Sequence, residues 1–388
     1  MKKKLTKIFS INFLGAGINF ITTILVVKLF GLEIFGDYVI LSSLVGLFTL
    51  IYTVIPPNFA IFKLQDDKSF YNIFIFNYIF NSFIITIVLY LSTYIIDYKF
   101  NIFLILLFGI LNGLMEYFNV YSQAINKSDK YFIMLFISYL AKLIFISILY
   151  FYIKIFTLDM ILLLNILSLF IALIYAYYYI GFEKIVINYK NYFSFIKDNF
   201  LILRGYYTNT FLKRIKDNAT VLVFSLLVNS EMIALYNLFT KITGFVLGQL
   251  RVVEAYIVNR QNLAHINITN NKIYTIGFVF QIFIILVGLV YLKISIDRYM
   301  FQELFIYSFL SYPYVNILLL RNKLLSDYNV NIINGMYLLY LSCLLIFSCI
   351  FYFIGTNLLY ILIFIVLSEI INVIYLKLKQ KIKALNYE

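Results

Sequence analysis

The sequence predicts an all-α polytopic membrane protein with about twelve transmembrane helices. Two observations support this prediction. Hydrophobic residues make up 63% of the 388 residues and charged residues only 13%, whereas about a quarter of the residues of a soluble domain are charged. Apolar runs of about 20 residues recur along the whole chain, and a helix of about 20 residues is long enough to cross the hydrocarbon core of a bilayer.

The apolar runs place the individual spans. The first run follows MKKKLTK and resembles a signal peptide, but no cleavage site of small residues precedes a soluble domain, so we expect an uncleaved first helix. Pro56 and Pro57 predict a helix stop near the end of the second span, and Pro313 predicts a kink in the tenth. The predicted spans are 8–30, 37–59, 71–95, 102–124, 131–153, 158–181, 206–228, 233–253, 274–293, 301–320, 330–353 and 357–376.

One long polar connection divides the chain into two halves. Residues 182–205 alternate aromatic and charged side chains, which is typical of an amphipathic helix lying on the membrane surface. We therefore expect six spans in residues 1–181, a cytoplasmic amphipathic linker over 182–205, and six more spans in residues 206–388.

Lysines and arginines orient the chain in the membrane. With the N-terminus in the cytoplasm, 20 of the 31 basic residues fall in inside segments, 5 in outside segments and 6 within spans. This asymmetry predicts a multi-pass protein with both termini in the cytoplasm. It also explains the net charge of +13 without a nucleic-acid partner.

A cluster of charges interrupts the seventh predicted span. On a helical wheel Asn209, Lys213, Lys216, Asp217 and Thr220 fall within one arc of about 100°, and Arg214 flanks it. Four charges facing lipid would cost on the order of 10 kcal/mol, so the arc should face protein or water and bind an anion. The alternative is a span that begins near residue 219, which would make these charges ordinary juxtamembrane residues.

Four further charged residues lie within other spans. Lys142 is about 16 Å into its span, near the middle of the bilayer, and Glu116, Lys241 and Glu369 lie at intermediate depth. Together with the cluster of the seventh span, these residues leave a formal charge of +2 in the membrane. A diphosphate is the natural complement, because an unpaired buried cation is costly. Structural ion pairs between helices are the alternative role, above all for Glu116 and Glu369, which are also candidates for ion coupling.

A weak internal repeat at an offset of 198 residues relates the two halves. It aligns Glu33-x4-Tyr38 with Glu231-x4-Tyr236 and Asn19 with Asp217. Asn19 is therefore a further candidate for the binding cavity. The repeat also sets Gly15, Ala16 and Gly17 opposite the bulky residues 213–215, so small side chains in one half would leave room for a substrate.

Two stretches resemble bacterial polysaccharide flippases of the O-antigen type, in the superfamily that also contains multidrug and oligosaccharidyl-lipid exporters. The first is FGLEIFGDYVILSS at residues 30–43, which links the first two helices. The second is DNATVLVFSLLVNSEMIALYNLFTKI at residues 217–242, which corresponds to their seventh and eighth helices. The resemblance implies two six-helix bundles around a central cavity that opens alternately to each face of the bacterial cytoplasmic membrane.

The resemblance also implies the cargo and the partners. The cargo would be an undecaprenyl-pyrophosphate-linked oligosaccharide for O-antigen, capsule or surface polysaccharide synthesis, with membrane lipid and polysaccharide polymerase machinery as partners. The pyrophosphate site expected on this chain consists of Lys213, Arg214, Lys216, Asp217, Lys142, Lys241, Asn19 and Asn209.

Other function classes remain as alternatives. A cation-coupled drug or small-molecule antiporter of the same superfamily would favour acidic cavity residues, and the net positive charge argues against it. A membrane glycosyltransferase or polymerase would need a sizeable outer loop, which the predicted spans do not leave. We expect no enzyme, cofactor or metal centre: His265 is the sole histidine, and Cys343 and Cys349 lie in one apolar segment as reduced residues. The 36 tyrosines and 41 phenylalanines are expected mostly in contact with lipid.

Overall fold

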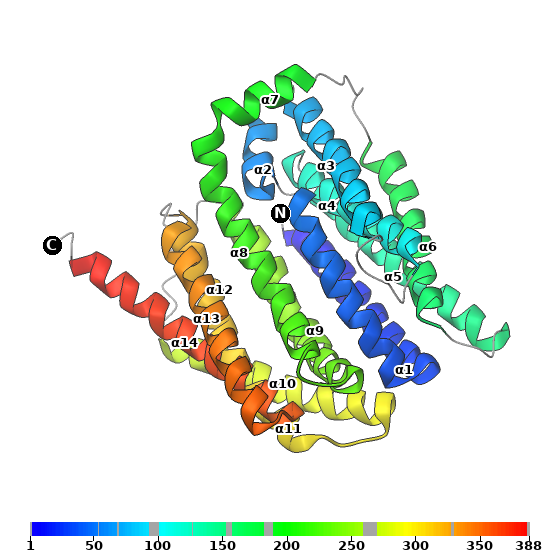
Figure 1. The fold of residues 1–388 in the computed structure, drawn as a ribbon. Helices are drawn as coiled ribbons and strands as arrows, with labels where there is room; N and C mark the ends of the chain where they lie inside the picture. Colours follow the sequence, from blue (N-terminus) through cyan, green and yellow to red (C-terminus); the bar gives the residue numbers. More distant parts are fainter. Residues whose placement is uncertain are drawn as a thin grey trace. The chain divides into compact units, whose positions relative to one another are not determined.

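The computed structural model describes residues 2–52, 54–67, 70–92, 101–125, 127–152, 157–181, 189–258, 270–326 and 330–385. Within these ranges the chain forms fourteen α-helices and no strand (Figure 1). The helices gather into two compact units. Unit 1 contains Met1–Thr22 and Leu41–Asn218, and unit 2 contains Thr23–Ile40 and Ala219–Glu388. Two helices, α1 (Lys2–Tyr52) and α8 (Phe200–Ser225), therefore contribute residues to both units.

The length and composition of the helices confirm an all-α polytopic membrane protein. Nine helical segments among the described residues are long and apolar enough to cross a membrane, and one of them, Thr6–Leu47, covers two predicted spans. The two remaining predicted spans, 206–228 and 233–253, are helices α8 and α9 (Ser230–Val258). Both helices are too polar to be among these nine apolar segments. Helix α8, for example, carries four charged side chains between residues 213 and 217.

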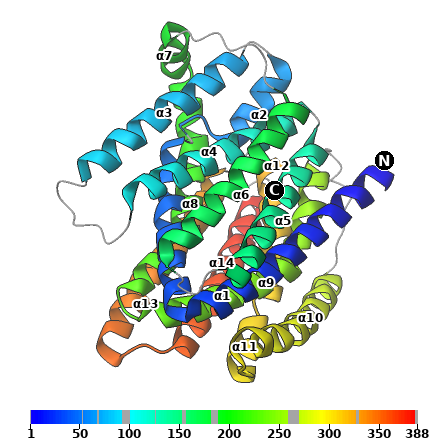
Figure 2. The same cartoon turned by 90° about the vertical axis from the view of Figure 1, so that its right-hand side faces the viewer.

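Unit 1 consists mainly of four long helices and two short ones. The apolar helices α3 to α6 supply its core. The helices are α2 (Pro57–Asp66), α3 (Phe70–Ser92), α4 (Ile102–Ala124), α5 (Ser128–Tyr152), α6 (Leu158–Tyr179) and α7 (Tyr189–Asp198). Helix α6 packs against both α4 and α5, and Figure 2 shows α4 and α6 side by side.

The first two predicted spans join at a glycine. Helix α1 runs from Lys2 to Tyr52 and is interrupted at Gly31, whose φ of 79° and ψ of 168° are not helical. Only glycine adopts such a conformation without strain. The second predicted span, 37–59, is too long: α1 ends at Tyr52, before the two prolines that were expected to stop it, and residues 57–66 form the separate helix α2. Pro56 is the N-cap of α2 and Pro57 its first residue, a position at which proline is favoured because its missing N–H would have no helical partner.

Residues 189–198 of the predicted linker form helix α7, which packs against α3 (Figure 1), whereas its residues 200–205 belong to α8. The buried Tyr192 hydroxyl donates a hydrogen bond to Asn77 Oδ1 over 3.0 Å. Burial raises the pKa of Tyr192 to about 12, so the hydroxyl stays protonated and available as a donor. The Phe59 ring lies 6.1 Å from that of Phe195 on α7 and 6.0 Å from that of Tyr206 on α8. These contacts fix α7 to α2, α3 and the start of α8.

Unit 2 contains helices α9 to α14, the middle of α1 (Thr23–Ile40) and the end of α8 from Ala219. Its other helices are α10 (Asn270–Ile296), α11 (Phe301–Ser308), α12 (Ser311–Ser326), α13 (Val330–Ile354) and α14 (Leu358–Leu385). The tenth predicted span is divided by a turn at residues 309–310, so the expected interruption lies just before Pro313, which occupies the first turn of α12. Cys343 and Cys349 are free thiols. His265 lies outside the described residues.

Candidate functional site

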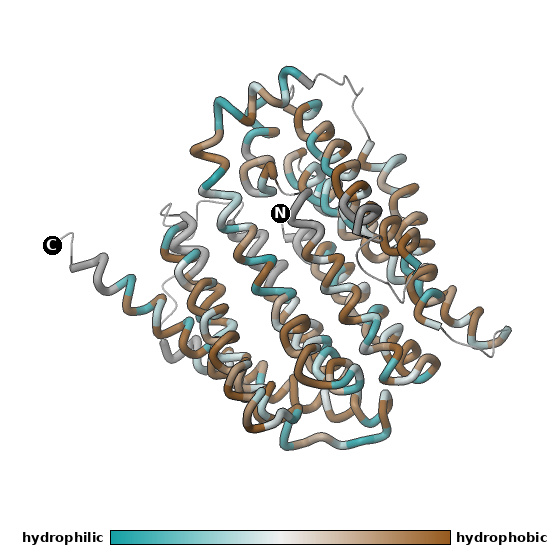
Figure 3. The backbone as a smooth tube through the Cα atoms, viewed as in Figure 1, coloured by the Kyte–Doolittle hydropathy of each residue, from teal (hydrophilic) through white to brown (hydrophobic). Residues whose placement is uncertain are grey.

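Helix α8 carries the charged cluster in its middle. The helix runs without interruption from Phe200 to Ser225, about 39 Å at 1.5 Å per residue, which is long enough to cross a bilayer. A helix that begins near Ala219 is therefore not what the structure shows. Hydrophilic residues interrupt the otherwise apolar helices at this point of α8 (Figure 3). The depth of the cluster in the membrane stays a prediction.

Arg214 is bound to α4 by an ion pair. Its Nη2 lies 3.1 Å from Glu116 Oε1, and the two side chains are 26% and 33% exposed. The Tyr131 hydroxyl on α5 is close enough to interact electrostatically with both charges. Because neither partner is fully buried, the pair keeps part of its hydration and avoids the full desolvation cost of a buried ion pair. Glu116 therefore has the interhelical pairing role that was one of its two expected roles.

A close helix approach supports the same turn of α8. A Cβ atom at Gly46 of α1 would overlap Asn218 Oδ1, so only glycine admits this contact without a shift. The Asn218 amide in turn donates to the Arg214 carbonyl over 2.9 Å. Through Gly46, Asn218 and Glu116, the charged turn of α8 is fixed to α1 and α4 within unit 1.

The other members of the cluster differ in exposure. Lys213 and Asp217 are exposed, whereas Lys216 and Asn209 are half-buried. Thr220, which the helical wheel placed on the same face, is 3% exposed and hydrogen-bonds Tyr340 Oη in unit 2 over 2.9 Å.

The predicted site residues are divided unequally between the units. Asn19 on α1 and Lys142 on α5 are half-buried members of unit 1, as are all the candidates on α8. Unit 1 thus contains four of the predicted cations and two of the predicted carboxylates, a formal surplus of +2. Lys241 and Glu369 belong to unit 2 and balance each other. The positive surplus within the predicted site lies entirely in unit 1.

Unit 2 contains a polar network that the sequence analysis missed. Glu369 Oε2 accepts a hydrogen bond of 3.0 Å from the Asn372 amide on the same helix. Tyr307 hydrogen-bonds Thr243 and interacts electrostatically with Glu369. The same tyrosine is within electrostatic range of Tyr236 and Tyr340. These three tyrosines are 3–8% exposed, so they face the interior of unit 2 and not lipid. The sequence feature that could have indicated this network is the occurrence of tyrosines along helices that also carry Thr, Asn and Glu.

Comparison with known proteins identifies the fold. No family model and no curated protein sequence matches the chain. Solved structures do match along nearly its full length. A structure of the lipid II flippase MurJ in an inward closed conformation is 16% identical, covers 96% of this chain and 87% of its own, and superimposes with a TM-score of 0.64. An inward-facing multidrug resistance MATE family transporter of the MOP superfamily is 12% identical, with coverage of 100% and 96% and a TM-score of 0.60.

The chain has the fold of MOP-superfamily transporters. A third MOP-superfamily transporter, from Pyrococcus furiosus, is 12% identical over 97% of this chain and 95% of its own, with a TM-score of 0.50. Likeness at this level of identity establishes architecture and not cargo. It confirms the expected superfamily fold and the multi-pass membrane character, whereas the O-antigen type of cargo depends on the site.

Proposed function

We propose that this protein translocates polyprenyl-pyrophosphate-linked oligosaccharides across the cytoplasmic membrane by alternating access. The observation that carries the proposal is the surplus of +2 among the predicted site residues of unit 1. Its centre is the basic triplet Lys213, Arg214 and Lys216, within five residues of one continuous helix. Charges in a membrane-spanning helix are costly and mark a substrate path by default. A surplus of cations fits an anionic head group.

The chemistry of the triplet suits a diphosphate. Arg214 is already oriented by Glu116 at 3.1 Å, and a guanidinium held in this way keeps further N–H donors for a second anion. The exposed Lys213 and half-buried Lys216 lie on either side of it in sequence and add mobile ammonium groups. Charge-assisted hydrogen bonds to phosphate are stronger than neutral ones, so the head group would bind here while its polyprenyl tail stays in lipid.

The structural relatives support a transporter and leave its cargo open. One is named a lipid II flippase, a carrier of a lipid-linked substrate. For the transporter from Pyrococcus furiosus, the reverse polarity of the binding pocket suggests a different function. Charge sign is thus a reasonable guide to cargo within this fold, and here the sign is positive. We place both termini in the cytoplasm of a bacterial cell, on the strength of the asymmetric basic residues.

A second candidate function is a cation-coupled drug antiporter. Glu369 favours it, because this carboxylate lies in the polar network of Asn372 and Tyr307, where a coupling ion or proton would have oxygen ligands. The MATE relatives share the fold to a similar degree. The two candidate functions require different side chains. A flippase would require the α8 cations, whereas an antiporter would require Glu369 and would carry a cationic drug.

A complementation assay tests the proposal. The chain is expressed in a bacterial strain that lacks its own oligosaccharide flippase, and surface polysaccharide is measured at matched membrane levels of protein. We expect the wild-type chain to restore polysaccharide and the triple variant Lys213→Gln, Arg214→Gln, Lys216→Gln to restore almost none. Drug resistance of the same cells is measured in parallel.

A matched triple variant controls for loss of positive charge. Lys197→Gln, Lys377→Gln and Lys379→Gln remove three exposed cations of α7 and α14 that lie outside the candidate site, and this variant should restore polysaccharide normally. Near-normal polysaccharide from the α8 triple variant would end the proposal. Drug resistance that depends on Glu369 and not on the α8 cations would favour the antiporter.

A further inference from the structure

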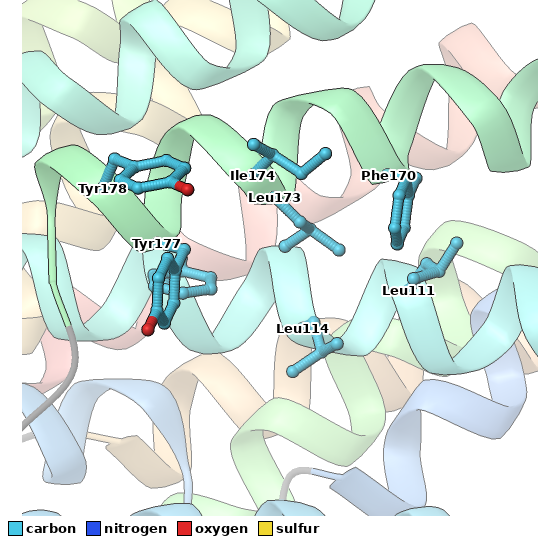
Figure 4. A pocket seen from close by; sticks show the side chains of 8 residues that line it. Leu111, Leu114, Phe170, Leu173, Ile174, Tyr177 and Tyr178 are labelled. Carbon is cyan, nitrogen blue, oxygen red and sulfur yellow. The ribbon is translucent and has the colours of Figure 1, made fainter. Parts of the chain in front are cut away.

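An apolar groove runs along the outside of unit 1 between α4 and α6. Its volume is about 430 Å³. Figure 4 shows side chains of both helices lining it, with Phe170 toward one end and Tyr177 and Tyr178 at the other. The remaining lining residues are Leu111, Leu114, Phe118, Leu173 and Ile174. In a multi-pass membrane protein such a groove between two spans is filled by hydrocarbon.

The groove has the length of one leaflet. Phe170 and Tyr178 are eight residues apart on α6, which is about 12 Å along a helix at 1.5 Å per residue. Half of a hydrocarbon core is about 15 Å thick. The groove therefore fits an acyl chain that enters from one surface of the membrane and ends near the midplane.

Two lysines lie at the C-terminal end of α6, where the groove has its two tyrosines. The Lys130 ammonium is 5.4 Å from the centre of the Tyr179 ring. Lys127 Nζ donates a hydrogen bond of 3.2 Å to the carbonyl oxygen of Ile180. Tyr179 and Ile180 follow Tyr178 in the chain, so both cations lie at the same end of α6 as the two tyrosines of the groove, with Lys130 on the side of α6 that packs against α5. The lysines precede and begin α5, and the tyrosines end α6.

The charge at this end is positive even when the nearby carboxylate is counted. Asp129 lies between the two lysines in sequence, and its Oδ2 is 3.8 Å from Lys7 Nζ. Three cations and one carboxylate leave a formal surplus of +2. Basic pockets at the ends of transmembrane helices bind anionic lipid head groups, because the phosphate can stay at the interface while the cations lose little hydration.

We propose that this groove is a binding site for an anionic phospholipid of the bilayer. One acyl chain lies between α4 and α6, and the phosphate lies against Lys127 and Lys130, with the Tyr178 hydroxyl as a further donor. The groove covers one leaflet, which suits an acyl chain better than the much longer chain of a polyprenyl lipid. The site lies on α4 and α6 and shares no residue with the candidate site on α8.

Native mass spectrometry of the purified full-length chain in detergent tests the proposal. Phosphatidylglycerol and phosphatidylethanolamine are titrated separately, and the fraction of protein with one bound lipid is measured. We expect phosphatidylglycerol to bind and phosphatidylethanolamine to bind at least tenfold more weakly. Lys127→Gln and Lys130→Gln should each weaken phosphatidylglycerol binding roughly fivefold. Ile174→Trp, which fills the groove, should abolish it.

Two control variants match these changes. Lys190→Gln with Lys197→Gln removes two exposed cations of α7, and Leu163→Trp adds the same bulk at a residue of α6 that is 46% exposed, as Ile174 is, but does not line the groove. Both controls should bind phosphatidylglycerol as the wild type does. Equal binding of the two lipids, wild-type binding by the lysine or Ile174 variants, or displacement of phosphatidylglycerol by an equimolar polyprenyl phosphate would each overturn the proposal.

Discussion

Helices α1 and α8 both pass from unit 1 into unit 2, but α1 is apolar and α8 carries a cluster of charges. The repeat offset of 198 carries Thr22 onto Thr220. Helix α1 passes from unit 1 to unit 2 after Thr22, and α8 does so after Asn218, only two residues from the corresponding position. Helix α1 breaks at Gly31, and the offset carries this glycine onto Asn229, in the turn between α8 and α9. The points at which the two helices enter unit 2 therefore nearly correspond, but their paths then differ, because α1 returns to unit 1 at Leu41 whereas the chain after Asn218 stays in unit 2.

The difference between the two helices lies in their side chains. Residues 6–47 of α1 form a long apolar candidate span, whereas α8 is too polar to be one. Gly15 is buried, and a Cβ at this position would be 3.4 Å from Tyr139 Cδ2. The corresponding residue of α8 is the exposed Lys213. The residues of α1 that the offset relates to the charged residues of α8 (15, 16, 18 and 19) are thus all uncharged.

The largest expected effect concerns the close approaches of α1 within each unit. A Cβ at Gly36 would overlap the backbone carbonyl oxygen of Ser230, whereas a Cβ at Gly46 would meet only the side chain of Asn218. A backbone cannot rotate away as an amide side chain can. We expect Gly36→Ala to destabilise the protein by about 3 kcal/mol and Gly46→Ala by about 1 kcal/mol.

Fluorescence-detected size-exclusion chromatography after heating measures this difference as the temperature at which half of the folded protein is lost. Gly244→Ala serves as the control, because nothing lies within 4 Å of a Cβ at that position of α9. Alanine favours helix over glycine, so this variant should be at least as stable as the wild type. Equal losses for the Gly36 and Gly46 variants would show that the two contacts do not differ as the structure indicates.

Hydropathy in the sequence predicts where the long helices lie but not which side chains of different helices meet. Span 102–124 coincides with α4 residue for residue, because hydropathy and the N-cap Asn101 both mark its ends. The short helix α2 was missed, since its ten residues are too few and too polar to read as a span. The Arg214–Glu116 pair joins residues 98 positions apart, and hydropathy contains no information about such partners. Likewise, the tyrosine network in unit 2 depends on which helix faces meet.

The second prediction separates transport from stability at corresponding positions of the two helices. If Lys213 contacts the pyrophosphate as proposed, Lys213→Gln removes one charge-assisted hydrogen bond, so transport should fall about tenfold to a hundredfold with no change in thermal stability. Lys213→Arg should be milder because the charge remains. Gly15→Leu should do the reverse and lower stability through its contact with Tyr139. Transport per folded molecule is measured as surface polysaccharide in the flippase-deleted strain. This measurement separates a loss of transport from a loss of stability in the Lys213 and Gly15 variants. A stability loss in Lys213→Gln would mean that α8 needs this charge for folding.

The third prediction tests whether the ion pair in unit 1 stabilises the charged turn. A double-mutant cycle with Arg214→Gln and Glu116→Gln should give a coupling free energy of about 1.5 kcal/mol, because each side chain is only partly exposed. The control cycle pairs Glu116→Gln with Lys197→Gln, an exposed cation on another helix, and should be additive. Thermal stability of the purified variants gives the free energies. Additivity in the first cycle would mean that Arg214 is oriented by other groups.

The smallest effect is expected at the two threonines that the offset relates. Thr220 Oγ1 is 2.9 Å from the Tyr340 hydroxyl, a bond between two helices, whereas Thr22 Oγ1 donates to the carbonyl oxygen of Ile18 on its own helix over 2.7 Å. Valine keeps the shape of threonine and removes the hydroxyl. Thr220→Val should therefore cost about 1 kcal/mol, and Thr22→Val close to nothing, because back-bonding to residue i−4 adds little to a helix. Thermal stability measured side by side tests this difference. If both variants lost the same stability, the end of α8 would have no more structural role in unit 2 than the matching point of α1. The difference in polarity between α1 and α8 would then come entirely from the charged residues between 213 and 217.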